Sequence, residues 1–294
     1  MAPEGQGEPH MWIALAAWVT SAAAGTLPGQ VDASSPHFEL EQAYTEAEDY
    51  AAFQRLEQRI DALLAEAAED ADLYWMKSRA MFEQGELVDR SAGIDMVAHY
   101  QAMAKSSEKG LELRPGDPHL RFAHGIALAR LGTTKGVLSS LFLARDVEAD
   151  WLAATEGSYA SLGGEEALPT DAYHALGVFY RLVPDWWIVQ VIAGTRGSLD
   201  KSLEMHEKAV AGRVSIDSLK ELGVTELCIA ESRGDDAMRA RAMATFDRAL
   251  AMPAHGAKHQ IDHQHIRGMK VDPSMACEYS RDGQQDLDRK RLDK

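Results

Sequence analysis

The stretch Tyr173–Tyr180, YHALGVFY, decides how this chain folds. The aromatic residues at its two ends and the central Leu176-Gly177 pair fall on one side of a helix, because residues three, four and seven apart share a face. The glycine has no side chain, so a second helix can approach this face closely. The stretch therefore predicts the first helix of a tightly packed helical hairpin.

The pattern matches the first half of the tetratricopeptide template, W-x2-L-G-x2-Y, at every spacing. Further matches to the two halves of the template follow in order along the chain: Ser202-x3-His206-x2-Ala209, Leu219-x2-Leu222-Gly223, and Ala242-x3-Phe246-x2-Ala249 before Pro253. An earlier segment, Gly125-x2-Leu128, fits a first helix. Several matches in helical order predict an all-α fold of irregular tetratricopeptide-like hairpins, an α-solenoid.

One hairpin carries an apolar insertion between its two helices. Ser202 lies 25 residues after Gly177, about twice the template spacing, and the extra residues are Pro184–Arg196, PDWWIVQVIAGTR. The rest of the chain is rich in good helix formers, and no strand pattern persists. We predict one helical domain over residues 38–283, followed by a charged tail over residues 284–294.

The first 37 residues are predicted to be a leader and a spacer. Residues 12–24, WIALAAWVTSAAA, form an uncharged apolar run that is shorter than a membrane-spanning helix and fits a signal-peptide core. Residues 1–10 contain two glutamates and no lysine or arginine, which departs from the usual positive start of a signal. We expect residues 1–33 to direct export to the periplasm, through a cleaved leader or an uncleaved anchor, and residues 34–37 to be a spacer.

Charge and cysteine content exclude several classes of protein. The formal charge of −16, with 30 Lys+Arg against 46 Asp+Glu, repels nucleic acid, so we expect no nucleic-acid binding. The two cysteines, Cys228 and Cys277, have no metal-binding spacing. We favour one buried and one surface thiol; the alternative is a disulfide, which requires an oxidising compartment.

The candidate sites are mostly better explained by structure than by chemistry. His255, His259, His263 and His265 are helically spaced, but no HExxH motif accompanies them, so we predict solvated or structural histidines and no metal. The stretch Ile192–Ser202, IAGTRGSLDKS, lacks the spacing of a phosphate loop and favours a helix start capped by Ser198. No nucleophile motif is present, so we predict no enzyme activity and no cofactor.

The adjacent residues Trp186 and Trp187 are the strongest candidates for a binding site. Neighbouring side chains on one helix cannot both face one core, so at least one should face a groove, a partner or the outer surface. Plain core packing is the favoured interpretation of the pair, and a hydrophobic ligand cleft or a subunit interface is the alternative. The predicted ligand or partner contacts are Trp186, Trp187 and Ile188, with Arg196 as an anion contact.

The segment Asp171–Leu203 resembles the T component of TRAP-type transporters, through its YHALGVFY motif, the apolar insertion and the sequence GTRGSLDK. The ending Asp272–Gly283, DPSMACEYSRDG, is similar as well. The resemblance implies an exported homotrimer that partners a periplasmic solute-binding protein and holds a small hydrophobic or carboxylate-bearing ligand. Many members carry a lipid-anchor cysteine, which this leader lacks. The alternative is a generic tetratricopeptide interaction scaffold.

Overall fold

The computed structural model describes residues 37–88, 93–136, 138–162 and 167–281. Within these ranges the chain is almost entirely helical, which confirms the predicted all-α fold. The predicted leader, most of the spacer and the charged tail lie outside the described residues.

The helices are α1 (Phe38–Glu46), α2 (Tyr50–Glu66), α3 (Ala71–Leu87), α4 (Met96–Leu113), α5 (Pro118–Lys135), α6 (Ala144–Ala154), α7 (Thr170–Leu182), α8 (Trp187–Ala193), α9 (Leu199–Gly212), α10 (Ile216–Arg233), α11 (Asp236–Ala251) and α12 (Gly256–Val271). Short 3-10 turns occur at η2 (Leu138–Leu143) and η3 (Pro273–Met275). Two short antiparallel strands, β1 (Tyr159–Ala160) and β2 (Ala167–Leu168), are an exception that the sequence did not predict. Their inward-facing residues, Tyr159 and Leu168, are both buried.

Four hairpins repeat one packing device. In α3/α4, α5/α6, α7/α9 and α10/α11, a glycine of the first helix faces a ring of the second. A Cβ atom added to the glycine would come within 2.5–2.6 Å of that aromatic side chain in each pair: Gly85 with Tyr100, Gly125 with Trp151, Gly177 with His206, and Gly223 with Phe246. The close approach predicted at Gly177 is therefore present, and the other three hairpins share it.

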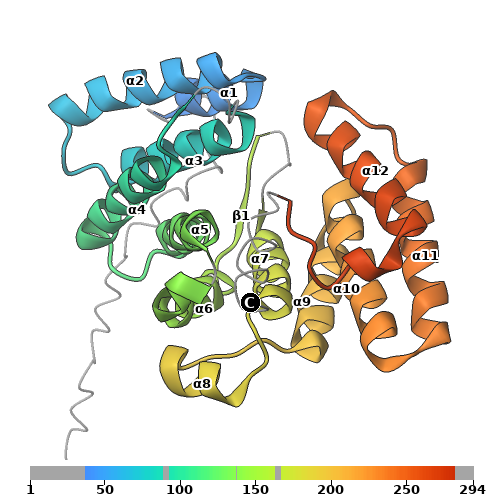
Figure 1. Ribbon diagram of the computed structural model, residues 1–294. Helices are drawn as coiled ribbons and strands as arrows, with labels where there is room; N and C mark the ends of the chain where they lie inside the picture. The colour runs from blue at the N-terminus through green and yellow to red at the C-terminus, as the bar shows by residue number, and fades with distance from the viewer. Residues whose placement is uncertain (1–36, 89–92, 137, 163–166, 282–294) are drawn as a thin grey trace, which may run out of the picture.

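The hairpins follow one another around a central axis. Figure 1 shows α1–α6 stacked on one side, α9–α12 on the other, and α7 between them. The insertion forms α8, which projects from the end of the molecule and packs against η2. Its helix ends at Gly194, whose φ of 73° is the left-handed conformation that glycine adopts without strain.

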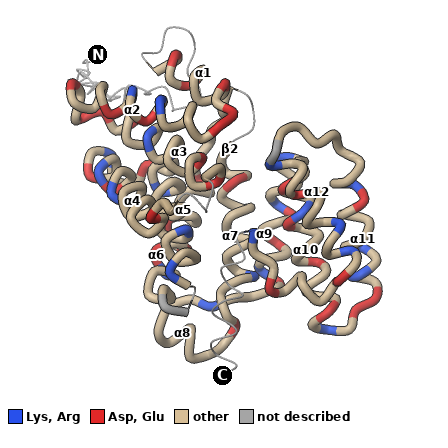
Figure 2. The backbone as a smooth tube through the Cα atoms, turned by 45° about the horizontal axis from the view of Figure 1, so that its top comes forward, with Lys and Arg blue, Asp and Glu red and all other residues tan. Residues whose placement is uncertain are grey.

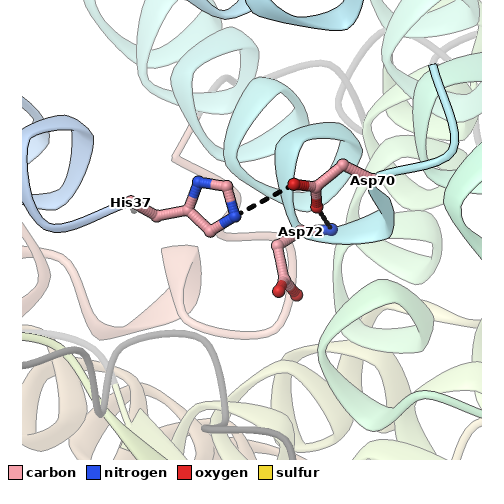
Figure 3. Close-up of side chains that lie close together, drawn as sticks. All are labelled: His37, Asp70 and Asp72. Atoms are coloured by element: carbon pink, nitrogen blue, oxygen red, sulfur yellow. Dashed lines mark hydrogen bonds and ion pairs between the residues drawn. The ribbon is translucent and has the colours of Figure 1, made fainter. Parts of the chain in front are cut away.

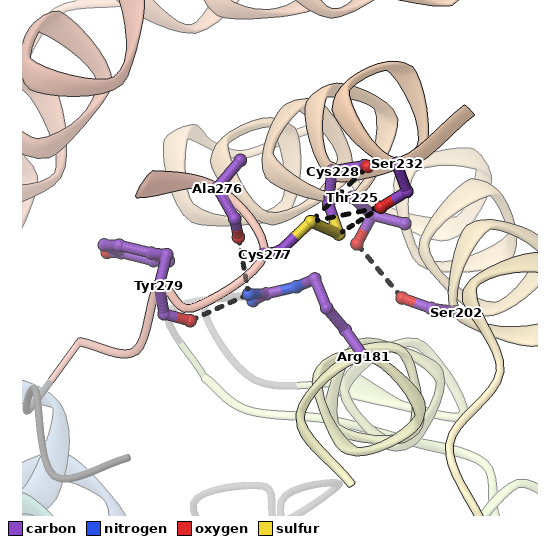
Figure 4. Close-up of a disulfide and its surroundings, with 8 residues drawn as sticks. All are labelled: Arg181, Ser202, Thr225, Cys228, Ser232, Ala276, Cys277 and Tyr279. Atoms are coloured by element: carbon purple, nitrogen blue, oxygen red, sulfur yellow. Dashed lines mark hydrogen bonds between the residues drawn. A yellow bond between two sulfur atoms is a disulfide. The ribbon is translucent and has the colours of Figure 1, made fainter. Parts of the chain in front are cut away.

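The chain after α12 folds back onto α10. A disulfide joins Cys228 of α10 to Cys277, with a Cα–Cα distance of 4.7 Å, so the favoured interpretation of two free thiols is wrong. The Arg181 guanidinium of α7 donates hydrogen bonds to the carbonyl oxygens of Tyr279 (2.7 Å) and Ala276 (3.4 Å), as Figure 4 shows. The disulfide and Arg181 together hold residues 276–281, which we call the C-terminal strap.

Candidate ligand groove and outer tryptophan helix

The first helices of the hairpins line a groove of about 400 Å³. Helices α3, α5 and α7 form one side of it, and α10, α12 and the C-terminal strap form the other. On α5 the lining positions include His119, Phe122, Ile126 and Arg130, which are three or four residues apart and so share one face. The groove therefore follows from the solenoid geometry, in which one helix of every hairpin faces inward.

The middle of the groove is apolar. Its lining includes five large hydrophobic side chains that are only partly buried: Phe82, Phe122, Ile126, Val178 and Leu182. They come from α3, α5 and α7, the three neighbouring first helices. An apolar concave surface with polar groups near its ends is the usual composition of a small-molecule site.

Ion pairs close one end of the groove. Glu83 of α3 pairs with Lys258 of α12, and Glu86 of α3 lies 3.6 Å from Arg281 of the C-terminal strap. Glu86 also lies 2.5 Å from Arg130 of α5. We call the two pairs between α3 and the C-terminal part, Glu83–Lys258 and Glu86–Arg281, the clasp. The clasp joins the first and last thirds of the chain across the groove.

A buried charge cluster supports the wall opposite the apolar residues. The Lys220 ammonium lies 2.6 Å from Asp217, 2.8 Å from Asp262 and 3.3 Å from Glu221, and Arg181 lies 2.5 Å from Glu221. Burial alone would lower the pKa of Lys220, but the surrounding carboxylates outweigh it and hold that pKa well above its usual value. Lys220 is therefore a permanently charged structural group rather than a general base.

The other end of the groove is aromatic. The rings of Trp75, His119 and Tyr159 meet edge to face, with centroid distances of 5.1–5.7 Å. Beside them, the guanidinium of Arg79 stacks over the Trp75 ring at 4.3 Å and pairs with Glu41 at 2.7 Å. We call Trp75, His119 and Tyr159 the aromatic end of the groove. Its arginine charge is compensated by Glu41, so a ligand there meets a largely neutral surface.

The predicted contact residues lie outside this groove: Trp187 and Ile188 are on α8, Trp186 is its N-cap, and Arg196 follows the helix. Trp187 is 72% exposed, Trp186 48% and Ile188 45%, so core packing of the tryptophan pair does not occur. Val189 and Ala193 are the buried residues of α8 and define its inner face. Figure 2 shows no charged residue along this helix. The groove was not located as the ligand site from the sequence, because the first-helix motifs mark inward-facing helices but not the distant elements that meet them.

Two predictions for the segment between α8 and α9 can be compared with the structure. Ser198 accepts a hydrogen bond from the backbone N–H of Lys201 at 3.3 Å, so its predicted role as the N-cap of α9 is confirmed. Arg196 is half exposed and pairs with Asp185 at 3.3 Å. The stretch IAGTRGSLDKS is thus a helix start with an ion pair beside it.

Three of the four histidines considered as metal ligands have ring contacts within the protein, and the fourth, His255, is exposed. His263 lies 3.1 Å from the carbonyl oxygen of Ala249, and His265 lies 2.8 Å from the hydroxyl of Tyr279. The ring of His259 accepts a hydrogen bond from the backbone N–H of His255. These separate partners direct the imidazoles to different places.

A separate cluster of one histidine and two aspartates, His37, Asp70 and Asp72, gathers three metal-type donors (Figure 3). Each is already engaged: His37 lies 3.1 Å from Asp70, Asp70 caps α3, and Asp72 pairs with Arg114. Hydrogen bonding to Asp70 raises the pKa of His37, and the same bond lowers the pKa of Asp70. The cluster therefore ties the start of α1 to the start of α3.

Comparison with protein-family models finds none that matches this chain, and comparison with curated proteins finds no match either. The resemblance to TRAP T components therefore remains a hypothesis supported by the motifs alone. Across the described ranges, no helix combines the length and the apolar character needed to cross a membrane.

Proposed function

We propose that this chain is a non-enzymatic helical-repeat binding protein that holds a small, largely apolar ligand in its groove. By its resemblance, it would serve as an exported accessory of TRAP-type solute uptake. The observation that carries the proposal is the groove itself, which has an apolar middle between a neutral aromatic end and a clasped charged end. Such a surface binds through burial of apolar area and needs no reactive group.

The charges of the groove support binding rather than catalysis. Lys220, Arg130 and Lys258 each lie within ion-pair distance of a carboxylate. Paired charges stabilise the wall but supply neither an activated nucleophile nor a poised base. A ligand would gain its affinity from the partly exposed apolar side chains between them.

The outer face of α8 supports a partner contact. Trp187, Val191 and Ile192 are all more than half exposed on one short helix, and Phe142 of the neighbouring η2 is exposed as well. Exposed aromatic clusters of this kind are typical of protein interfaces. We assign this face to the periplasmic solute-binding protein or to the homotrimer that the resemblance implies. A generic interaction scaffold is the second candidate, because the same face suits any apolar partner.

Filling the groove tests the ligand proposal. The uncharged fluorescent probe N-phenyl-1-naphthylamine should bind the wild-type chain, and Ile126→Trp should abolish that binding by occupying the middle of the groove. The matched control, Ile261→Trp, places the same bulk on an exposed position of α12 outside the groove and should leave binding unchanged. Equal binding by both variants would contradict the proposal.

The partner proposal needs its own experiment. A gene for a TRAP permease or solute-binding protein beside this one would supply the partner to test. Trp187→Ala should weaken its capture, whereas Val271→Ala, at an exposed position of α12, should not. Capture that is unaffected by Trp187→Ala would remove α8 from the interface.

A further inference from the structure

His119 is a buried polar side chain in the groove wall without a polar partner. Its residue is 1% exposed, and neither ring nitrogen makes a hydrogen bond in the described structure. The ring instead packs edge to face against Trp75 (5.7 Å) and Tyr159 (5.1 Å). Folded proteins rarely leave buried polar atoms unsatisfied, so such an atom in a ligand groove points to a group that the ligand supplies.

Other buried or partly buried histidines among the described residues show what is unusual about His119. His263 bonds to a backbone carbonyl, as does His99, whose ring lies 2.7 Å from the Met81 oxygen. His206 also lacks a hydrogen-bond partner, but its ring packs against Gly177 and edge to face against His174 inside the α7/α9 hairpin, and it does not line the groove. His119 therefore combines an unsatisfied imidazole with a position in the groove wall.

The protonation state of His119 defines the chemistry that it can recognise. Burial lowers the pKa of His119 to about 4, so the ring is neutral at pH 7. A neutral imidazole offers one N–H donor and one acceptor nitrogen. A hydroxyl can both donate and accept, so it matches this ring, whereas an ionised carboxylate only accepts and loses its hydration in a buried site. The nearby Arg79 does not change this preference, because its charge is paired with Glu41.

Building on the proposed ligand groove, we propose that His119 determines specificity and selects amphiphiles with an uncharged hydroxyl head group. The head group binds the imidazole at the aromatic end, and the apolar body lies along Phe122 and Ile126. These three side chains share one face of α5 and span seven residues, or about 10 Å along the helix axis. The inference narrows the expected ligand from a hydrophobic or carboxylate-bearing molecule to an apolar alcohol.

The experiment compares 1-dodecanol with dodecanoate at pH 7.5, each displacing N-phenyl-1-naphthylamine from the protein. We expect the wild-type chain to bind the alcohol about tenfold more tightly than the carboxylate. His119→Phe should weaken binding of the alcohol about tenfold, the effect of one lost hydrogen bond to a neutral group, and His119→Gln should retain most of the affinity. The matched control is His206→Phe, the same change at a buried, unpartnered histidine outside the groove, and it should leave binding unchanged.

Thermal unfolding of the empty proteins gives a second measurement. His119→Phe keeps the aromatic contacts and removes the unsatisfied nitrogens, so we expect its midpoint to rise while its affinity for the alcohol falls. A lower midpoint together with unchanged affinity would show that His119 is purely structural. If the wild-type chain binds the alcohol and the carboxylate equally, the head-group preference is wrong but the groove remains. If it binds no probe at all, the proposed function itself is wrong.

Discussion

Removing the disulfide should destabilise the C-terminal hairpin measurably. The bond joins Cys228 to Cys277 across 49 residues, a span that includes α11 and α12. In the chain-entropy description, closing a loop of this length stabilises the folded state by about 4 kcal/mol. For a domain of this size each kcal/mol corresponds to about 2–4 °C, so the double variant Cys228→Ala/Cys277→Ala should unfold roughly 10 °C lower.

The assay is thermal unfolding by circular dichroism, with and without a reductant. Thiol titration of the denatured protein should find no free thiol before reduction and two after it. The reductant should lower the midpoint of the wild-type chain, while the double variant, which has nothing to reduce, is the control. If the reductant shifts both proteins equally, or if the untreated protein has two free thiols, the reasoning fails. Arg181 still anchors the C-terminal strap after reduction, so complete unfolding is not expected.

The remaining predictions concern packing, a buried ion pair and pH. Gly223→Ala should cost about 1–3 kcal/mol in urea unfolding, because its Cβ would meet the Phe246 ring at 2.6 Å; Gly268→Ala, with no neighbour within 4 Å, should instead gain about 0.5–1 kcal/mol. Arg181→Leu removes the partner that lies 2.5 Å from the buried Glu221 carboxylate and leaves it only Lys220, 3.3 Å away, so it should cost about 3 kcal/mol in the same unfolding assay. A second change to leucine at residue 221 should recover part of that loss. For His37→Gln the prediction is pH-dependent. The folded-state pKa of the histidine is raised, so its stabilisation is complete below about pH 6.5 and is lost as pH rises through the raised value; the midpoint difference from wild type should therefore shrink between pH 6 and 9, and a constant difference would contradict the ion pair.

Local sequence patterns predicted the helices and their pairing. The motif around Gly177 marked a close helix contact, Ser198 marked a helix start, and the insertion marked a separate element. Each of these features depends on residues within one or two turns of a helix, or on a repeat of known period. The sequence therefore contained enough information to predict them.

Contacts between residues far apart in the sequence could not be predicted from local periodicity or repeat motifs. The pair Glu83–Lys258 joins residues 175 positions apart, and the disulfide joins two residues whose spacing matches no motif. Periodicity shows which face of a helix is apolar but not which distant element meets it. The groove and the unsatisfied ring of His119 depend on contacts between elements that are distant in the sequence, so the candidate site could not be located from the sequence.

The clasp has a consequence for how this protein can change in size. An open array of helical hairpins can gain or lose a unit, because each unit touches only its neighbours. Here α3 and α12 also touch each other across the groove, through Glu83 and Lys258. Inserting one hairpin would move α12 away from α3 and separate the two side chains. Deleting one hairpin would leave α12 unable to reach α3. The contact between α3 and α12 therefore fixes the number of hairpins between them. We expect a variant with one duplicated hairpin to fold only if it loses the Glu83–Lys258 contact.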